Sequence, residues 1–103
     1  MSEYQGVTPP NNVEAEQSVL GAMLQDGNAV LQAAESLLPE DFYQPQHKEI
    51  FDAMIALHRE QKPVDFITVD SELSRRGTSE GTGGAPYLLH LVQYVPTTAN
   101  VKA

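Results

Sequence analysis

The stretch VEAEQSVLGAML, residues 13–24, has the composition and spacing of an amphipathic helix. When successive residues are placed 100° apart, five apolar side chains share one arc: Val13, Val19, Leu20, Met23 and Leu24. Glu16 falls within the same arc, so we expect a buried acid at this position. It also stands in the first helical turn, where free N–H groups and the helix dipole stabilise a carboxylate. We therefore expect Glu16 to have a structural role.

Gly21 interrupts this helix, although an interior glycine costs about 1 kcal/mol relative to alanine. Small residues gather with it on the side of the helix away from the apolar arc: Ala15, Ser18, Gly21 and Ala22. Small side chains let another backbone approach closely, so this ridge predicts a tight helix contact. A contact inside the domain is favoured over one across a subunit boundary, and the sequence leaves both open.

Four further helices follow from the spacing of apolar residues and from the turn residues between them. They are expected at residues 29–38, 46–60, 68–76 and 86–95, and a sixth helix is expected to begin at Thr97 or Thr98. We expect FITV, residues 66–69, to be an extended lead-in with Thr68 as the N-cap, and residues 78–84 to be a loop with little to anchor it. The fold is predicted to be all-α, a compact orthogonal bundle of five to six short helices. Residues 1–8 are expected to be a disordered tail, and residues 9–103 a single globular head domain.

The composition narrows the class of function. The chain has 103 residues, a formal net charge of −8 and no cysteine, which excludes disulfides and thiolate chemistry. An acidic surface repels phosphate backbones, so little direct nucleic-acid binding is expected and protein partners fit better. Neither a signal peptide nor an apolar run of membrane-spanning length is present, so we expect no membrane association and a cytoplasmic location.

No catalytic, metal or cofactor site is predicted. Gly83 and Gly84 are followed by Ala85 and Pro86, whereas a phosphate-binding loop needs Gly-Lys-Ser/Thr after its glycines. His47 and His58 share a helix face but stand roughly 16 Å apart at 1.5 Å rise per residue, too far for one metal ion. One enzymatic alternative is acid–base chemistry by Glu16 and a histidine, which would require the two side chains to be close.

Two tyrosines and a histidine mark a candidate partner surface on the last long helix. Tyr87, His90 and Tyr94 lie along one flank, beside the apolar stripe. One interpretation is a core edge whose hydroxyl groups reach solvent, and the other is a binding surface, since aromatic residues are enriched at interface hot spots.

Six segments of the sequence, taken together, resemble a known family. They are PPNNVEAEQSVLGAML, DFYQPQHKEIFDAM, PVDFITV, LSRRG, GGAPYL and VPTTAN, which run in order from Pro9 almost to the end of the chain. In these segments the chain resembles the N-terminal region of bacterial replicative DNA helicases of the DnaB type. The family usually has apolar residues near positions 79 and 82, where this chain has Ser79 and Thr82, so the resemblance leaves open how firmly that loop is held.

The resemblance implies an all-helical, non-catalytic head that forms one tier of a hexameric ring around DNA, with other helicase subunits as partners. It also implies docking of the helicase-binding domain of primase, with Tyr87 near the primase-facing part. ATP and Mg²⁺ would belong to a separate RecA-like domain, which we expect to be missing here together with the helical hairpin that follows the head. No cofactor is expected in this chain. The alternative without the resemblance is an acidic helical adaptor unrelated to replication.

Overall fold

The computed structural model describes residues 12–93, which form five α-helices and two short 3₁₀ helices with no strand among them. The α-helices are α1 (Val13–Gln25), α2 (Gly27–Ser36), α3 (Pro45–Arg59), α4 (Phe66–Arg76) and α5 (Gly84–Gln93). The 3₁₀ helices are η1 (Pro39–Asp41), before α3, and η2 (Glu80–Thr82), before α5. The predicted all-α class is confirmed. The expected tail over residues 1–8, Tyr94 and the expected sixth helix lie outside the described residues.

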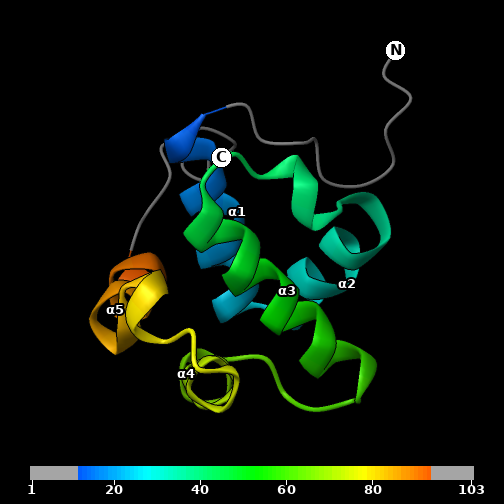
Figure 1. The fold of residues 1–103 in the computed structure, drawn as a ribbon. Helices are drawn as coiled ribbons and strands as arrows, with labels where there is room; N and C mark the ends of the chain where they lie inside the picture. Colours follow the sequence, from blue (N-terminus) through cyan, green and yellow to red (C-terminus); the bar gives the residue numbers. More distant parts are fainter. Residues whose placement is uncertain (1–11, 94–103) are drawn as a thin grey trace.

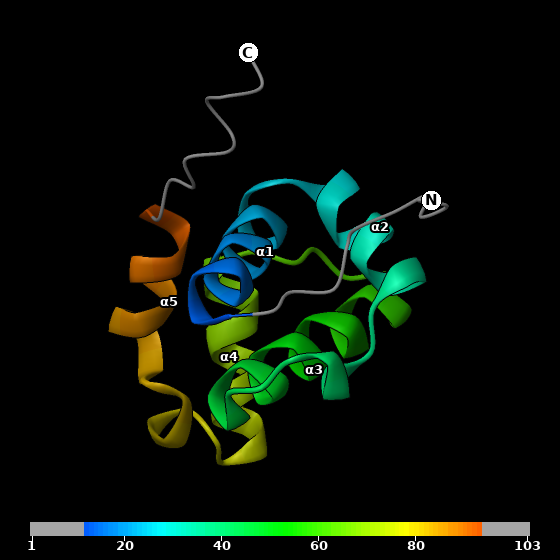
Figure 2. The same cartoon turned by 90° about the horizontal axis from the view of Figure 1, so that it is seen from above.

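Helix α3 runs through the middle of the described domain, with α2 on one side of it and α4 and α5 on the other (Figure 1). Seen from above, α1 lies between α5 and α2 and contacts both of them (Figure 2). The chain therefore brings its first and last described helices together. Among residues 12–93, none of the helices combines the length and apolar character that crossing a bilayer requires.

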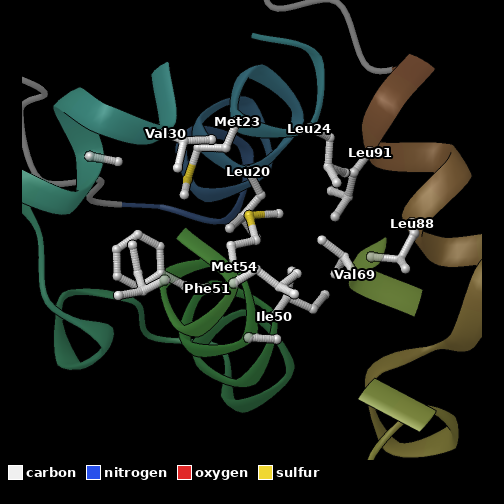
Figure 3. Close-up of a cluster of buried hydrophobic side chains, with 14 of the residues drawn as sticks. Leu20, Met23, Leu24, Val30, Ile50, Phe51, Met54, Val69, Leu88 and Leu91 are labelled. Carbon is white, nitrogen blue, oxygen red and sulfur yellow. The ribbon is translucent and has the colours of Figure 1, made fainter. Parts of the chain in front are cut away.

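All five α-helices contribute to one apolar core (Figure 3). On α3, Ile50, Phe51 and Met54 have no exposed surface, and the ring of Phe51 lies 4.9 Å from that of Phe42. Burial of one such side chain is worth about 1.5–3 kcal/mol, so α3 is the main source of apolar stabilisation. The predicted apolar arc of α1 is only partly right, because Val13 is exposed whereas Leu20, Met23 and Leu24 are buried.

Side-chain caps explain where α1 and α2 begin. The Asn12 side chain accepts a hydrogen bond from the Ala15 N–H at 2.7 Å, which satisfies a free donor of the first turn. Asp26 ends α1 through its backbone N–H and caps α2 by accepting from the Asn28 N–H at 2.9 Å. Because Asp26 serves both helices, α2 begins at Gly27, two residues earlier than predicted.

The expected extended lead-in at residues 66–69 is wrong, because these residues form the first turn of α4. Asp65 is the N-cap: its side chain accepts from the Thr68 N–H, and the Thr68 hydroxyl oxygen accepts from the Asp65 N–H, each at 2.9 Å. This reciprocal pair is a capping box, with Thr68 as its third helical residue and not as the cap. The helix ends at Arg76, and Gly77, with a φ of 78°, is its C-cap, as the Arg75-Arg76-Gly77 sequence predicts.

The loop before α5 is held by more contacts than the sequence suggests. Thr82 is buried, and its hydroxyl donates to the carbonyl oxygens of Thr78 and Ser79, both at 3.0 Å. The Gly84 N–H also donates to the Ser79 carbonyl, at 2.8 Å. Hydrogen bonds thus anchor this loop, so the expectation of a loop with little to anchor it is wrong.

Candidate functional site

A buried polar chain connects three helices that are far apart in sequence. Glu16 of α1 lies 2.6 Å from His47 Nδ1 on α3, and His47 Nε2 lies 2.5 Å from the hydroxyl of Tyr87 on α5. The Glu16 and His47 side chains are 1% and 0% exposed. The Gln17 side-chain amide donates to the Tyr87 hydroxyl at 3.3 Å and completes the chain. We call Glu16, His47 and the half-buried Tyr87 the triad.

Glu16 also holds the start of α3. Its carboxylate accepts from the backbone N–H groups of Tyr43, at 2.6 Å, and Gln44, at 3.3 Å. Gln44 is the N-cap of α3 and makes no side-chain capping hydrogen bond of its own. The carboxylate of α1 therefore supplies acceptors at this end of α3 that local sequence does not provide, in a place where the helix dipole favours negative charge.

The hydrogen-bond partners assign the proton positions of the triad. A carboxylate only accepts, so His47 Nδ1 carries a hydrogen. In the neutral ring, Nε2 then accepts the Tyr87 O–H, and the Tyr87 oxygen accepts from the Gln17 amide. Every buried polar side-chain atom in residues 12–93 has a partner. A fully satisfied buried network of this kind rigidifies a core.

A carboxylate, a histidine and a hydroxyl that are joined by hydrogen bonds can also act as an acid–base catalyst. The enzymatic alternative is therefore tested against this geometry. Glu16 and a histidine do lie close together, as that alternative requires. A substrate has no access to the pair, however, because both side chains are enclosed by the core. The triad is therefore a structural tie between α1, α3 and α5.

The candidate partner residues are placed differently from one another. Tyr87 is half-buried and its hydroxyl faces inward to His47, so the expectation that it reaches solvent is wrong. The Tyr87 ring stacks on those of His47 and His90, at centroid distances of 5.8 and 5.9 Å. His90 is exposed, and Tyr94 lies outside the described residues. His90, supported by Tyr87, is thus the outward-facing part of the predicted surface.

The small residues of α1 do not form one buried ridge. Gly21 is buried, Ala15 and Ser18 are half-buried, and Ala22 is exposed. The Ser18 hydroxyl donates to the Glu14 carbonyl at 3.0 Å, within its own helix. Gly21 therefore remains the residue of this set at which close packing is expected.

An ion-pair cluster between α3 and α4 was not predicted from the sequence. Glu72 is 9% exposed and accepts two hydrogen bonds from Arg75, at 2.6 and 3.1 Å, and one from Arg76, at 2.9 Å. Arg76 also reaches Glu49 and Asp52 on α3, both at 3.0 Å. The spacing of Glu72 three and four residues before two arginines was the available signal. The cluster joins α4 to α3 on the surface.

These contacts shift the titration of the cluster. Hydrogen bonds from Arg75 and then Arg76 lower the pKa of Glu72 from 4.5 to about 2, against the opposing effect of burial. Partial burial disfavours the charged Arg76, but hydrogen bonds from its guanidinium to Glu72, Asp52 and Glu49 outweigh it and raise its pKa. The charged forms are therefore the stable ones at neutral pH.

We expect Glu72→Gln to change how the free energy of unfolding falls at acidic pH. Because the folded pKa is below the unfolded one, the ionised carboxylate stabilises the fold fully above about pH 4.5, and this contribution is lost as pH falls towards 2. The variant should lose about 1–3 kcal/mol at pH 7 and show a flatter fall in unfolding free energy between those values. Urea titrations across this pH range measure both. The exposed Glu35 of α2 offers a matched control, Glu35→Gln, and an equal acid slope in Glu72→Gln and wild type would contradict the assignment.

Within residues 12–93, no group of three His, Asp or Glu side chains is placed to hold a metal ion.

Comparison with known proteins gives consistent matches. Residues 8–103 match the family model of the DnaB-like helicase N terminal domain. The replicative DNA helicase DnaB of Mycobacterium leprae is 46% identical over 99 residues, which cover 96% of this chain and 16% of that protein. The corresponding protein of Geobacillus stearothermophilus is 47% identical over 94 residues, or 91% of this chain and 21% of that protein. The chain thus spans about a fifth or less of the length of these curated relatives.

A solved structure is similar to most of this chain. The crystal structure of the N-terminal domain of DnaB helicase from Mycobacterium tuberculosis matches with a TM-score of 0.81 at 47% identity, covering 90% of this chain and 65% of that one. The likeness therefore extends to sequence and backbone together.

Proposed function

Because the chain belongs to the family of DnaB-like helicase N-terminal domains, we propose that it is the non-catalytic head of a replicative DNA helicase. In this role it would support assembly of a hexameric ring and recruit primase in the cytoplasm. The observation that carries the proposal is the family match over residues 8–103, together with the backbone likeness to a solved helicase head.

Two features support a role without catalysis. The 103 residues contain no Gly-Lys-Ser/Thr motif for nucleotide phosphates, and the side chains of Glu16 and His47 are enclosed by the core. ATP binding, with its Mg²⁺, would then be the task of another part of a longer helicase chain. The formal charge of −8 also disfavours direct contact of this domain with DNA.

The proposed primase surface is the flank of α5 around Tyr87 and His90. The Tyr87 hydroxyl is held by its hydrogen bond to His47, and the exposed ring of His90 stacks on the Tyr87 ring. A preorganised aromatic surface loses little entropy when a partner binds, which favours it as an anchor. Tyr94, seven residues after Tyr87, is proposed to extend the same surface.

We expect His90→Ala to weaken binding of the helicase-binding domain of the cognate primase by about 1–2 kcal/mol, or roughly 5- to 30-fold in Kd. Surface plasmon resonance with the immobilised primase domain measures this, and the wild-type chain should bind with a Kd on the order of micromolar, as small transient interfaces do. The unfolding free energy of the variant should fall by no more than about 1 kcal/mol, because His90 is exposed and the variant loses its stacking on Tyr87.

Lys48→Ala, on an exposed position of α3, is the matched control and should leave primase affinity unchanged. A wild-type chain that does not bind primase would favour the acidic adaptor over the helicase head. Saturable heat of Mg-ATP binding in a calorimeter would contradict the non-catalytic role. Unchanged affinity in a folded His90→Ala chain would move the primase surface away from α5.

A further inference from the structure

A strip of exposed side chains follows the chain from the outer face of α2 through η1 to the start of α3. Three large apolar side chains belong to it: Leu31 is 46% exposed, Leu38 57% and Tyr43 82%. Glu35 and Glu40 are exposed between them. Leu31 and Glu35 are one helical turn apart on α2, so they share its outer face. We call Leu31, Glu35, Leu38, Glu40 and Tyr43 the acidic strip.

The local backbone turns two of the apolar side chains outward. Leu37, Leu38 and Phe42 have extended backbones, and successive residues of an extended segment face opposite sides. Leu37 and Phe42 are buried in the core, at 4% and 1% exposure. Their neighbours Leu38 and Tyr43 therefore point away from the core and into solvent.

Hydrogen bonds hold this part of the acidic strip in place. The Leu38 N–H donates to the Asp41 carboxylate at 2.8 Å, and the Asp41 N–H donates to the Leu38 carbonyl at 2.9 Å. The Tyr43 N–H donates to the Glu16 carboxylate at 2.6 Å. The exposed apolar side chains thus stand on a fixed backbone, and a preorganised surface loses less entropy when a partner binds.

The charge around the acidic strip is of one sign. Residues 12–47 hold six acids and no lysine or arginine. One of these acids, Glu16, is buried against His47. In the part of the chain that the structure describes, the Glu35 and Glu40 side chains have neither an ion pair nor a hydrogen bond. Both carboxylates are therefore available to a cation from another molecule.

Charge complementarity determines which kind of partner fits. The acidic strip repels the phosphates of nucleic acids and of anionic lipids. A second copy fits poorly, because it presents the same acids and its Lys62, Arg75 and Arg76 are already paired with acids of their own chain. An amphipathic helix with lysine or arginine beside apolar residues matches both the carboxylates and the exposed apolar side chains.

We propose that the acidic strip binds a basic amphipathic helix of another protein. Apolar residues of that helix pack on Leu38 and Tyr43, and its lysine or arginine side chains pair with Glu35 and Glu40. Figures 1 and 2 show α2 and α5 on opposite sides of the domain, with α1 between them in Figure 2. The acidic strip is therefore separate from the proposed primase surface on α5, and it adds a second docking surface to the domain.

A designed peptide tests the acidic strip on the unaltered chain. The probe has about 15 residues, with leucine at helical spacing on one face and lysine at the other positions. Added to the ¹⁵N-labelled chain, it should shift the amide resonances of residues 31–43 in NMR spectra until they saturate. A scrambled peptide of the same composition has the same charge but no apolar face, and it should bind about fivefold more weakly or less.

Surface variants separate the two parts of the contact. Tyr43→Ser removes the most exposed apolar side chain and should weaken binding of the peptide about fivefold. Glu40→Gln removes one carboxylate and should make the dissociation constant less sensitive to added salt. Leu89→Ser, at a 44% exposed position on α5, is the matched control and should bind the peptide as wild type does. The amide spectrum of each variant reports whether its fold is retained.

Three results would overturn the proposal: shifts spread over exposed acids outside the acidic strip, equal affinity for the scrambled peptide, or unchanged affinity in a folded Tyr43→Ser chain. Addition of the helicase-binding domain of primase should leave the peptide-induced shifts in place. Displacement of the peptide would show one surface where two are proposed, and would also overturn the inference. None of these results requires that primase fails to bind, so they are distinct from failure of the proposed function.

Discussion

Replacing Glu16 by alanine is expected to lower the free energy of unfolding by about 3–5 kcal/mol, because it removes a buried carboxylate that accepts several hydrogen bonds. The carboxylate accepts hydrogen bonds from the Tyr43 and Gln44 N–H groups and contacts His47 Nδ1, so its loss leaves these three N–H groups without their acceptor. Small domains have a total stability of about 5–15 kcal/mol, so the variant should be close to unfolded at 37 °C. Urea denaturation followed by far-ultraviolet circular dichroism measures the change.

Glu14→Ala is the matched control, because Glu14 occupies the same helical turn but is exposed. It should alter stability by less than about 0.5 kcal/mol. Tyr87→Phe removes the far end of the triad alone and should cost about 1–2 kcal/mol, since His47 Nε2 then lacks its hydroxyl partner. A Glu16→Ala chain within 1 kcal/mol of wild type would show that the triad is not a structural tie.

Gly83→Ala is expected to cost about 2–4 kcal/mol, the second large effect, for two separate reasons. Gly83 has a φ of 100°, a conformation that strains any L side chain. An added Cβ would also stand 2.5 Å from the Tyr87 Cβ, where no atom can fit without a shift. Relief of the clash requires α5 to move away, which would draw the Tyr87 hydroxyl from His47. The loss of stability should therefore be accompanied by a change in the ring resonances of His47 and His90 in NMR spectra.

Gly81→Ala provides the control for this substitution within the same short loop. A Cβ at Gly81 would meet nothing within 4 Å, and the residue is exposed. We expect its effect on the midpoint of thermal unfolding to be small. If Gly83→Ala unfolds at the same temperature as Gly81→Ala, the close approach of η2 to Tyr87 is not a constraint on the fold.

The helices were largely predictable because their signals are local. Asn12 as the cap of α1 and Gly77 as the stop of α4 depend on neighbours within one turn. The error at residues 66–69 also has a local cause. Asp65 and Thr68 are both good capping residues, and the capping box makes Asp65 the N-cap. The β-branched composition of residues 66–69 suggested an extended segment, so the earlier helix start was missed.

The polar network was only half predictable. Glu16 could be placed in the core because its angle on the helix is fixed by the backbone period. Its partner could not, because His47 is 31 residues away and meets it only through the packing of α1 on α3. Tyr87 shows the same limit: helix periodicity placed it at the edge of the core, but the inward direction of its hydroxyl depends on the position of His47. A buried acid does need a partner, and that requirement was the signal that could have prompted a search among the histidines.

The reach of the triad also determines when this domain can finish folding during protein synthesis. Its links span 31 and 40 residues, and the hydroxyl that completes it comes from the last described helix. Until α5 has left the ribosome, α1 and α3 can approach each other, but His47 still lacks one of its two partners. Long-range closure of this kind makes the final step slow and cooperative relative to the formation of single helices. A nascent chain that pauses before residue 87 is therefore held in an incomplete state, in which a chaperone or a protease can still bind the exposed core of the first four helices.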